Sequence, residues 1–394
     1  MVSESAQAKS GARRRLRLGM VGGGQGAFIG GVHRIAARLD DRYELVAGCF
    51  ASTAEKSKAS GIELGIDPAR TYDDFEAMAK AEAGRDDGID VVSIVTPNHV
   101  HFAAAAAFLE AGIHVICDKP MTTSLMDAVA LQALVAKSGK VFALTHNYTG
   151  YPMIRQARAM VEAGDLGAIR VVQVEYAQDW LATKLEDSGL KQAEWRTDPA
   201  RSGPAGSTGD IGTHAMNLAT FVTGLEIDEL AAELSTFVPG RRLDDNCQVM
   251  LRFVGGARGL LWASQVACGN ENALKLRVYG EKGGLEWAQE DPNYLWHMPL
   301  GEPKRLITRS GAGAGPEAAR VTRIPPGHPE GYLEGFATIY SDTAELIWAA
   351  IEGREPEPGA TLVPDVTEGA RGVKFIEAVV GSSGSGAAWR SARL

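Results

Sequence analysis

Arg17-Leu-Gly-Met-Val-Gly-Gly-Gly-Gln-Gly-Ala-Phe-Ile-Gly-Gly-Val-His33 is an apolar run that breaks into glycines and then resumes with a helix-like pattern. The pattern predicts a strand, a tight turn and the start of a helix. Gly22, Gly24 and Ala27 fit the G-x-G-x-x-G/A spacing. The first position turns the chain, the second lets a pyrophosphate approach the backbone, and the third lets helix and strand pack closely.

A pyrophosphate would bind the free N–H groups at the helix N-terminus, where the helix dipole favours negative charge. A tight connection without a ligand is the alternative, but the motif opens the first βα unit of a chain that continues β, α, β. We therefore predict dinucleotide binding here. The expected contacts in the turn are Gly22, Gly24, Gln25, Gly26, Ala27 and Phe28.

Length and composition limit the possible classes of protein. A chain of 394 residues is long for one core and suits two domains. A net charge of −9 provides no basic surface for nucleic acid or an anionic membrane. Residues 1–15 lack the apolar core of a signal peptide, so we expect a disordered leader on a cytoplasmic protein. Four widely spaced cysteines show no metal-ligand pattern and are expected to be free thiols.

The end of the second expected strand, residues 43–50, bears on cofactor choice. Sites that prefer NAD often place a carboxylate about 20 residues beyond the glycine motif, to hold the ribose hydroxyls. Here the strand leads into Ser52 and Thr53 without a carboxylate, and Ser52 and Lys56 could accept the 2′-phosphate of NADP. No arginine stands at this strand end, which slightly favours NAD.

Polar residues follow the next three expected strands of the first domain. Ligands of open α/β sheets bind beyond the carboxyl ends of the strands. The third strand, within residues 86–96, leads into a Thr-Pro-Asn-His-Val-His sequence, the fourth (residues 113–117) into Asp-Lys-Pro, and the fifth (residues 141–146) into Asn-Tyr. From these segments we expect cofactor contacts by Thr96, Pro97, Asn98, His101, Asp118, Lys119 and Asn147.

The second half of the chain has a different character. Residues 169–176, 229–238, 246–253, 259–267, 274–279 and 284–287 show the alternation of antiparallel strands. The sequence therefore predicts a doubly wound Rossmann domain over residues 16–148. An α+β domain with a large, mostly antiparallel, open-faced sheet is expected over residues 149–394. The open face of this sheet predicts a homodimer or homotetramer.

One expected helix, residues 206–218, interrupts these strands and carries Asp210 and His214. Residues four apart lie on the same face of a helix, so a carboxylate and an imidazole can share a site there. The spacing also suits a metal, but the absence of a nearby third ligand favours acid–base chemistry. Lys119 sits at a strand end between an acid and a proline, where a nicotinamide should lie. A lysine buried beside a cationic ring has a lowered pKa that suits proton transfer.

Substrate contacts are expected from three segments. Lys184, Lys191, Trp195, Arg196 and Arg201 fall before the helix of residues 206–218 and suit a sugar ring with an anionic substituent. A solvated loop around one buried tryptophan explains them equally well. His328 and Tyr332 begin a later helix and are weaker candidates. The expected substrate-binding set is Lys119, Tyr148, Trp195, Arg196, Asp210, His214, His328 and Tyr332.

In order and spacing, these motifs resemble the Gfo/Idh/MocA oxidoreductases, the glucose–fructose oxidoreductase and inositol dehydrogenase family. The resemblance covers residues from about 16 to 380 and implies Lys119, Asp210 and His214 as the catalytic group. Asp118 stands where the family usually has Glu. The resemblance also implies a cis peptide at Lys119–Pro120, a form that proline makes less costly.

The chemistry implied is hydride transfer between NAD(P) and a secondary hydroxyl of a sugar, sugar derivative or polyol. His214 is expected to act as base, Lys119 as donor to the developing alkoxide, and Asp210 as the group that orients substrate or imidazole. The roles of Lys119 and His214 could be exchanged. Two alternatives remain: an NAD-dependent, redox-neutral glycosidase that acts on an anionic glycoside such as a sulfoquinovoside, and a non-catalytic dinucleotide sensor.

Overall fold

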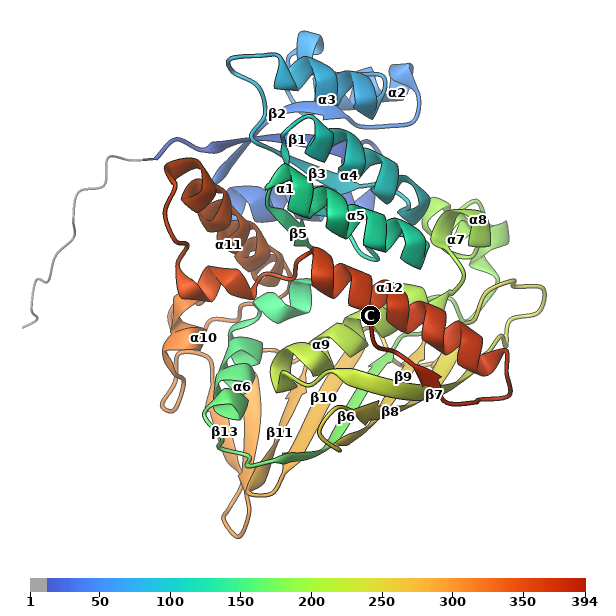
Figure 1. The fold of residues 1–394 in the computed structure, drawn as a ribbon, viewed down its shortest axis with the longest axis vertical. Coiled ribbons are helices and arrows are strands. Elements are labelled where there is room, and N and C mark those ends of the chain that lie inside the picture. Colours follow the sequence, from blue (N-terminus) through green and yellow to red (C-terminus); the bar gives the residue numbers. More distant parts are fainter. Residues whose placement is uncertain (1–12) are drawn as a thin grey trace, which may run out of the picture.

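A parallel sheet forms the first half of the molecule (Figure 1). The structure, a computed structural model, describes residues 13–394. All neighbouring strands of this sheet are parallel, in the order β2-β1-β3-β4-β5. The strands are β1 (Leu16–Gly22), β2 (Tyr43–Cys49), β3 (Val91–Val95), β4 (His114–Cys117) and β5 (Phe142–Leu144). The order reverses beside β1, and a doubly wound sheet binds its ligand at such a point.

The helices of this half are α1 (Phe28–Leu39), α2 (Ala54–Glu63), α3 (Phe75–Ala83), α4 (His101–Glu110) and α5 (Leu125–Ser138). Their ends follow from local chemistry. The Ser124 hydroxyl accepts a hydrogen bond from the N–H of Asp127 and so caps the start of α5 at Leu125. Gly139 ends the same helix in the left-handed conformation. Strands β3, β4 and β5 are buried at every residue, as in covered parallel sheets.

A nine-stranded sheet forms the second half, in the order β13-β12-β11-β10-β6-β9-β8-β7-β14. Only β6 and β9 pair in parallel among its neighbours, so the predicted fold class is confirmed. The strands are β6 (Ile169–Ala177), β7 (Ile227–Ser235), β8 (Asn246–Phe253), β9 (Arg258–Ser264), β10 (Ala273–Gly280), β11 (Gly283–Ala288), β12 (Tyr294–Pro299), β13 (Arg305–Thr308) and β14 (Arg390–Ser391). The sequence analysis missed the last three.

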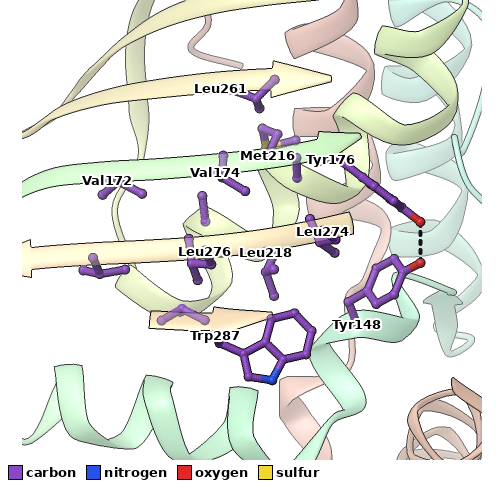
Figure 2. Close-up of a cluster of buried hydrophobic side chains, with 14 of the residues drawn as sticks. Tyr148, Val172, Val174, Tyr176, Met216, Leu218, Leu261, Leu274, Leu276 and Trp287 are labelled. Atoms are coloured by element: carbon purple, nitrogen blue, oxygen red, sulfur yellow. Dashed lines mark hydrogen bonds between the residues drawn. The ribbon is translucent and has the colours of Figure 1, made fainter. Parts of the chain in front are cut away.

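Helices α6 (Pro152–Glu162) and α9 (Thr213–Thr223) cover one face of this sheet (Figure 1). Figure 2 shows the core between them, where Leu218 of α9 lies near Leu274 and Leu276 of β10, with Trp287 beside them. Within residues 13–394 no helix covers the other face in this way, and Met250 and Leu260 are 49% and 51% exposed on it. Oligomerisation through this face stays a prediction.

Two long helices return from the second half to the first. α11 (Tyr332–Glu352) packs against α1, and α12 (Val366–Ser383) packs against α5. The Tyr340 hydroxyl lies 2.9 Å from Nδ1 of His33 and 2.8 Å from the Ser93 hydroxyl, so α11 is part of the buried core of the first sheet. The division of the chain at residue 148 therefore stays a prediction.

The ends of the described chain are tied down by specific contacts. The leader prediction falls mainly on residues 1–12, outside the described residues. Its last residues are ion-paired, with Arg14 on Asp90 and Arg15 on Asp41. At the other end, Trp389 lies under the guanidinium of Arg252, 3.8 Å from it. Between residues 13 and 394, no helix has both the length and the apolar character that crossing a membrane requires.

Candidate active site

The glycine turn after β1 has the backbone that its sequence predicted. Gly22 and Gly23 have φ of +81° and +71°, the left-handed region that favours glycine. A Cβ on Gly24 would lie 2.5 Å from the Ser60 hydroxyl. The close packing of helix on strand belongs to Gly30, not to Ala27: a Cβ on Gly30 would lie 2.3 Å from the backbone of Gly23. The role assigned to Ala27 was therefore wrong.

A cavity of about 370 Å³ opens at this turn. Its wall includes Gly24, Gln25, Gly26, Ala27 and Phe28. No side chain caps the N-terminus of α1, and the space around the α-carbon of Gly26 is open. A phosphate group can therefore reach the first N–H groups of the helix. The turn fits the pyrophosphate of a dinucleotide.

Further along the same edge, two buried polar atoms have no hydrogen-bond partner within residues 13–394: Oγ1 of Thr96 and Nδ2 of Asn147. Such orphaned groups are costly unless a ligand or water completes them. Phe28, which lines a cavity together with Asn147, is 68% exposed, an unusual state for a large apolar side chain outside a binding site. These features fit the nicotinamide end of the same dinucleotide.

Several other residues predicted to contact the cofactor line neither of the cavities at this edge of the sheet. His101 is buried, with its ring nitrogens 2.8 Å from the carbonyl of Pro120 and 3.0 Å from that of Thr96. Asn98 donates to the carbonyl of Ser202, and Pro97 precedes it at the cap of a short helix. Ser52 and Lys56 are exposed after β2. Lys119–Pro120 is a cis peptide bond.

A second cavity, of about 600 Å³, lies between the two sheets and shares Phe28 with the first. It contains Lys119, Asp210 and His214, the three residues predicted to be catalytic. The remaining lining residues are Phe28, Ile29, Asp118, Thr145, Asn147, Tyr148, Tyr176, Gln178, Trp180, Gln192, Arg196, Ile211, Glu271, Asn272, Gln289, Tyr332 and Phe336.

Lys119 and Asp210 form the charged centre of this cavity. The ammonium of Lys119 donates to the carbonyl of Asp210 and to its Oδ1, the latter at 3.0 Å. On the other side, Oδ2 of Asp210 lies 3.3 Å from Nε of Arg196. Burial raises the pKa of Asp210, but the charges of Lys119 and Arg196 outweigh burial and hold this pKa well below its ordinary value. Asp210 is therefore a carboxylate at neutral pH.

The helix of Asp210 differs from the predicted one. Thr208–Gly212 is a single π-helical turn that continues into α9, and such turns are frequent at functional sites. Asp210 thus pairs with Lys119, Arg196 and Gln265, and no hydrogen bond joins it to His214 within the described chain. Asp210 was predicted to orient either the substrate or the imidazole of His214, and the second of these roles is not seen.

His214 lies among rings. Its centroid is 4.9 Å from that of Tyr148, 5.3 Å from that of His146 and 6.3 Å from that of Tyr176, all in edge-to-face contact. Burial and the charge of Lys119 lower the pKa of His214 well below its ordinary value. Burial also lowers the pKa of His146, to about 3. His214 is therefore a neutral imidazole at pH 7, able to accept a proton.

One wall of the cavity is a chain of hydrogen-bonded polar side chains. The hydroxyls of Tyr148 and Tyr176 are 2.5 Å apart, and Figure 2 shows them meeting. The hydroxyl of Tyr176 and the amide of Gln178 both donate to Oδ1 of Asn272, each at 2.7 Å. Trp180 then donates to Gln178 at 3.1 Å. Apart from Tyr148, the sequence analysis missed this wall, although polar residues at the ends of β6 and β10 were a usable signal.

The remaining predicted substrate residues divide into two groups. Tyr332 and Arg196 line the cavity, and Trp195 supports Arg196 by stacking 4.2 Å from its guanidinium. His328 is exposed and is not among the lining residues. Lys184, Lys191 and Arg201 also lie outside the lining, and Lys184 pairs with Asp187.

Comparison with known proteins agrees with this geometry. Residues 16–146 match the family described as "Oxidoreductase family, NAD-binding Rossmann fold", GFO_IDH_MocA. Residues 154–286 match the GFO/IDH/MocA C-terminal domain. The chain is 36% identical over 377 residues to the uncharacterized oxidoreductase YfiI of Bacillus subtilis, a match that spans 95% of this chain and 96% of that protein.

Solved structures show the same architecture. An oxidoreductase from Sinorhizobium meliloti is 58% identical, with a TM-score of 0.87 and coverage of 96% of this chain and 100% of that one. An inositol dehydrogenase homolog from Azotobacter vinelandii, complexed with NADH and myo-inositol, is 36% identical. Its TM-score is 0.88, with coverage of 96% and 98%.

Proposed function

We propose that this chain, which belongs to the Gfo/Idh/MocA family of oxidoreductases, oxidises a secondary hydroxyl of a neutral cyclic polyol or sugar with NAD as hydride acceptor. Its motifs predicted the family correctly. One observation carries the proposal: a single cavity brings together a lysine, a carboxylate and a neutral imidazole, next to a glycine turn that fits a dinucleotide. Bound NAD supplies the carbon that accepts the hydride.

His214 is the proposed base. Oxidation of an alcohol requires that the hydroxyl proton leave as the C–H bond breaks, and a neutral imidazole accepts it. The low pKa of His214 keeps the ring unprotonated before substrate binds. The exchange of roles with Lys119 stays open as the alternative assignment.

Lys119 is the proposed donor to the substrate oxygen. An ammonium has three N–H donors. Two of them bond to Asp210, at its carbonyl and at Oδ1, which leaves one for the oxygen where negative charge develops. Asp210 thus holds the ammonium in place. A donor fixed before the reaction costs no reorganisation during it.

The charges in the cavity favour a neutral substrate. Its lining holds two cations, Lys119 and Arg196, and both are paired with Asp210. Asp118 and Glu271 add negative charge. No cation of this lining is left unpaired for a sulfonate or phosphate, so the electrostatic argument for an anionic glycoside is lost.

The polar wall described above offers both donors and acceptors to a ring with several hydroxyls, and Trp180 offers an apolar face beside it. The similarity to a protein solved with myo-inositol supports the same class of substrate. NAD is favoured over NADP because no arginine follows β2, where a 2′-phosphate would lie.

The test is a panel of free cyclic polyols, free sugars and neutral and anionic aryl glycosides, each with NAD or NADP, in which NADH or NADPH absorbance and aglycon release are recorded together. We expect NADH formation with a polyol or free sugar. Aglycon release that requires NAD and leaves no net NADH would replace the proposal with the redox-neutral glycosidase. Cofactor binding without turnover of any compound would instead support the sensor.

A further inference from the structure

We infer that Gln265 is a positioning residue for the oxidation proposed above: it fixes the carboxylate of Asp210 so that this carboxylate holds Lys119 toward the substrate. The inference rests on the proposed function. Gln265 directly follows β9, is 2% exposed and is not among the residues that line the cavity. It therefore acts through Asp210 and not on the substrate itself.

The hydrogen bonds of Asp210 divide between its two oxygens. Nε2 of Gln265 donates to Oδ2 at 2.8 Å, and Nζ of Lys119 donates to Oδ1 at 3.0 Å. The terminal torsion of an aspartate is broad and roughly two-fold, so a carboxylate held at only one oxygen rotates easily. With Oδ2 bound by Gln265, Oδ1 stays on the side of Lys119.

The backbone around Gln265 is fixed on both sides. Its N–H donates to the carbonyl of Asp245 at 2.8 Å, and its carbonyl accepts from the N–H of Leu181 at 3.1 Å. Asp244, the residue before Asp245, accepts hydrogen bonds at its carboxylate from Gly206, Ser207 and Thr208, at 2.6–2.9 Å. The same loop thus anchors both the start of the segment that carries Asp210 and the amide that orients its carboxylate.

Arg196 does not replace this function, although it contacts the same oxygen at 3.3 Å. It belongs to the short helix α7 (Lys191–Arg196), and its guanidinium also bonds Gln192 and stacks on Trp195, both of α7. Its position therefore follows that of a short surface helix. Gln265, in contrast, is buried and brings no positive charge, so the charge of Asp210 remains available to Lys119.

The first test is Gln265→Leu, which removes the donor at similar size. We expect kcat to fall about ten- to a hundredfold, the usual effect of losing a hydrogen bond to a charged group, with KM and the Kd for NAD within about twofold. The matched control is Gln248→Leu on the exposed face of β8, which should leave kcat unchanged. A kcat for Gln265→Leu equal to that of the wild type would overturn the inference.

The second test is Gln265→Glu, which places a second carboxylate against Asp210. Two carboxylates in contact share a proton at low pH and repel each other at high pH. The charged and titratable groups that face Asp210 are Lys119, Arg196, His214, Tyr148 and Tyr176. Burial raises the pKa of both tyrosines, so they stay neutral over this pH range. We expect kcat of Gln265→Glu to approach the wild-type value near pH 5 and to fall relative to it toward about pH 9.

A substrate-free readout separates the two proposals. The same repulsion should widen the difference in urea midpoint between wild type and Gln265→Glu as pH rises, because protonation of the pair is lost. If the wild type oxidises nothing in the panel, the proposed function fails, yet this midpoint difference still reports the contact. A difference that does not vary with pH would overturn the contact of Gln265 with Asp210.

Discussion

The two walls of the active-site cavity are built in different ways. The cofactor wall consists of the glycine turn, whose own cavity shares Phe28 with the active-site cavity, and of the ends of parallel strands, where Asn147 lines the active-site cavity. The substrate wall consists of long polar side chains from distant segments that bond to one another, from Tyr148 to Asn272. The first wall depends on backbone shape, and the second depends on side-chain chemistry.

The largest expected effect is a fall in kcat, without a change in NAD binding, when a residue of the substrate wall is replaced. His214→Gln removes the proposed base while keeping a polar side chain, and we expect kcat to fall about 10²- to 10⁴-fold, the usual contribution of general base catalysis. The Kd for NAD, measured by fluorescence titration, should change little because the glycine turn is intact. The matched control is His297→Gln on β12, far from the cavity lining. A loss of NAD binding in His214→Gln would contradict the separation of the walls.

The second effect tests backbone shape. Gly30→Ala places a Cβ 2.3 Å from the backbone of Gly23, so α1 must shift. Overpacking of this kind costs about 1–3 kcal/mol of unfolding free energy, and the shift should weaken NAD binding. Denaturant unfolding and NAD titration measure both effects.

Gly31→Ala is the matched control for this change. The same Cβ at Gly31 meets only the end of the Arg34 side chain, at 4.0 Å. Because alanine is a better helix former than glycine, this variant should gain up to about 1 kcal/mol of stability. Equal behaviour of the two variants would show that close packing at Gly30 is unimportant.

The third effect concerns the acid stability of the parallel sheet, at the amino end of β4. Nδ1 of His114 accepts a hydrogen bond from the N–H of Val141 at 2.9 Å, and burial lowers the pKa of His114 to about 4. In the unfolded chain His114 takes up a proton near pH 6.5, whereas in the folded chain it does so only near pH 4. The contribution of His114 to the free energy of unfolding is therefore fully present above pH 6.5. It declines as pH falls toward 4, by up to about 1.4 kcal/mol per pH unit.

Urea unfolding at several pH values measures this slope. His114→Asn should reduce it by the contribution of one histidine, while the other buried histidines whose pKa burial lowers, among them His33 at about 4 and His146 at about 3, keep the remainder. His99→Asn, at an exposed position, should leave the slope unchanged. An unchanged slope in His114→Asn would contradict the assignment.

Much of the cofactor wall could be predicted because its signals are local. The glycine turn and the residues after β3, β4 and β5 each lie within a few positions of a strand end. Even there, the close contact of Gly30 with Gly23 was assigned to Ala27, because motif spacing does not show which side of a helix faces the strand. His328 was predicted from its place before a helix, which says nothing about the direction of its side chain.

The family and the two-sheet fold class could be predicted from the sequence, and the resemblance to the family already grouped Lys119, Asp210 and His214, which share one cavity. Periodicity and short motifs encode these features locally. The folded chain was needed to show that Asp210 pairs with Lys119, Arg196 and Gln265 and, within residues 13–394, not with His214. The pairing of Tyr148 with Tyr176 and Asn272 was decided in the same way. These contacts join segments tens of residues apart, and their geometry depends on how β6, β9, β10 and α7 pack, which no local pattern records.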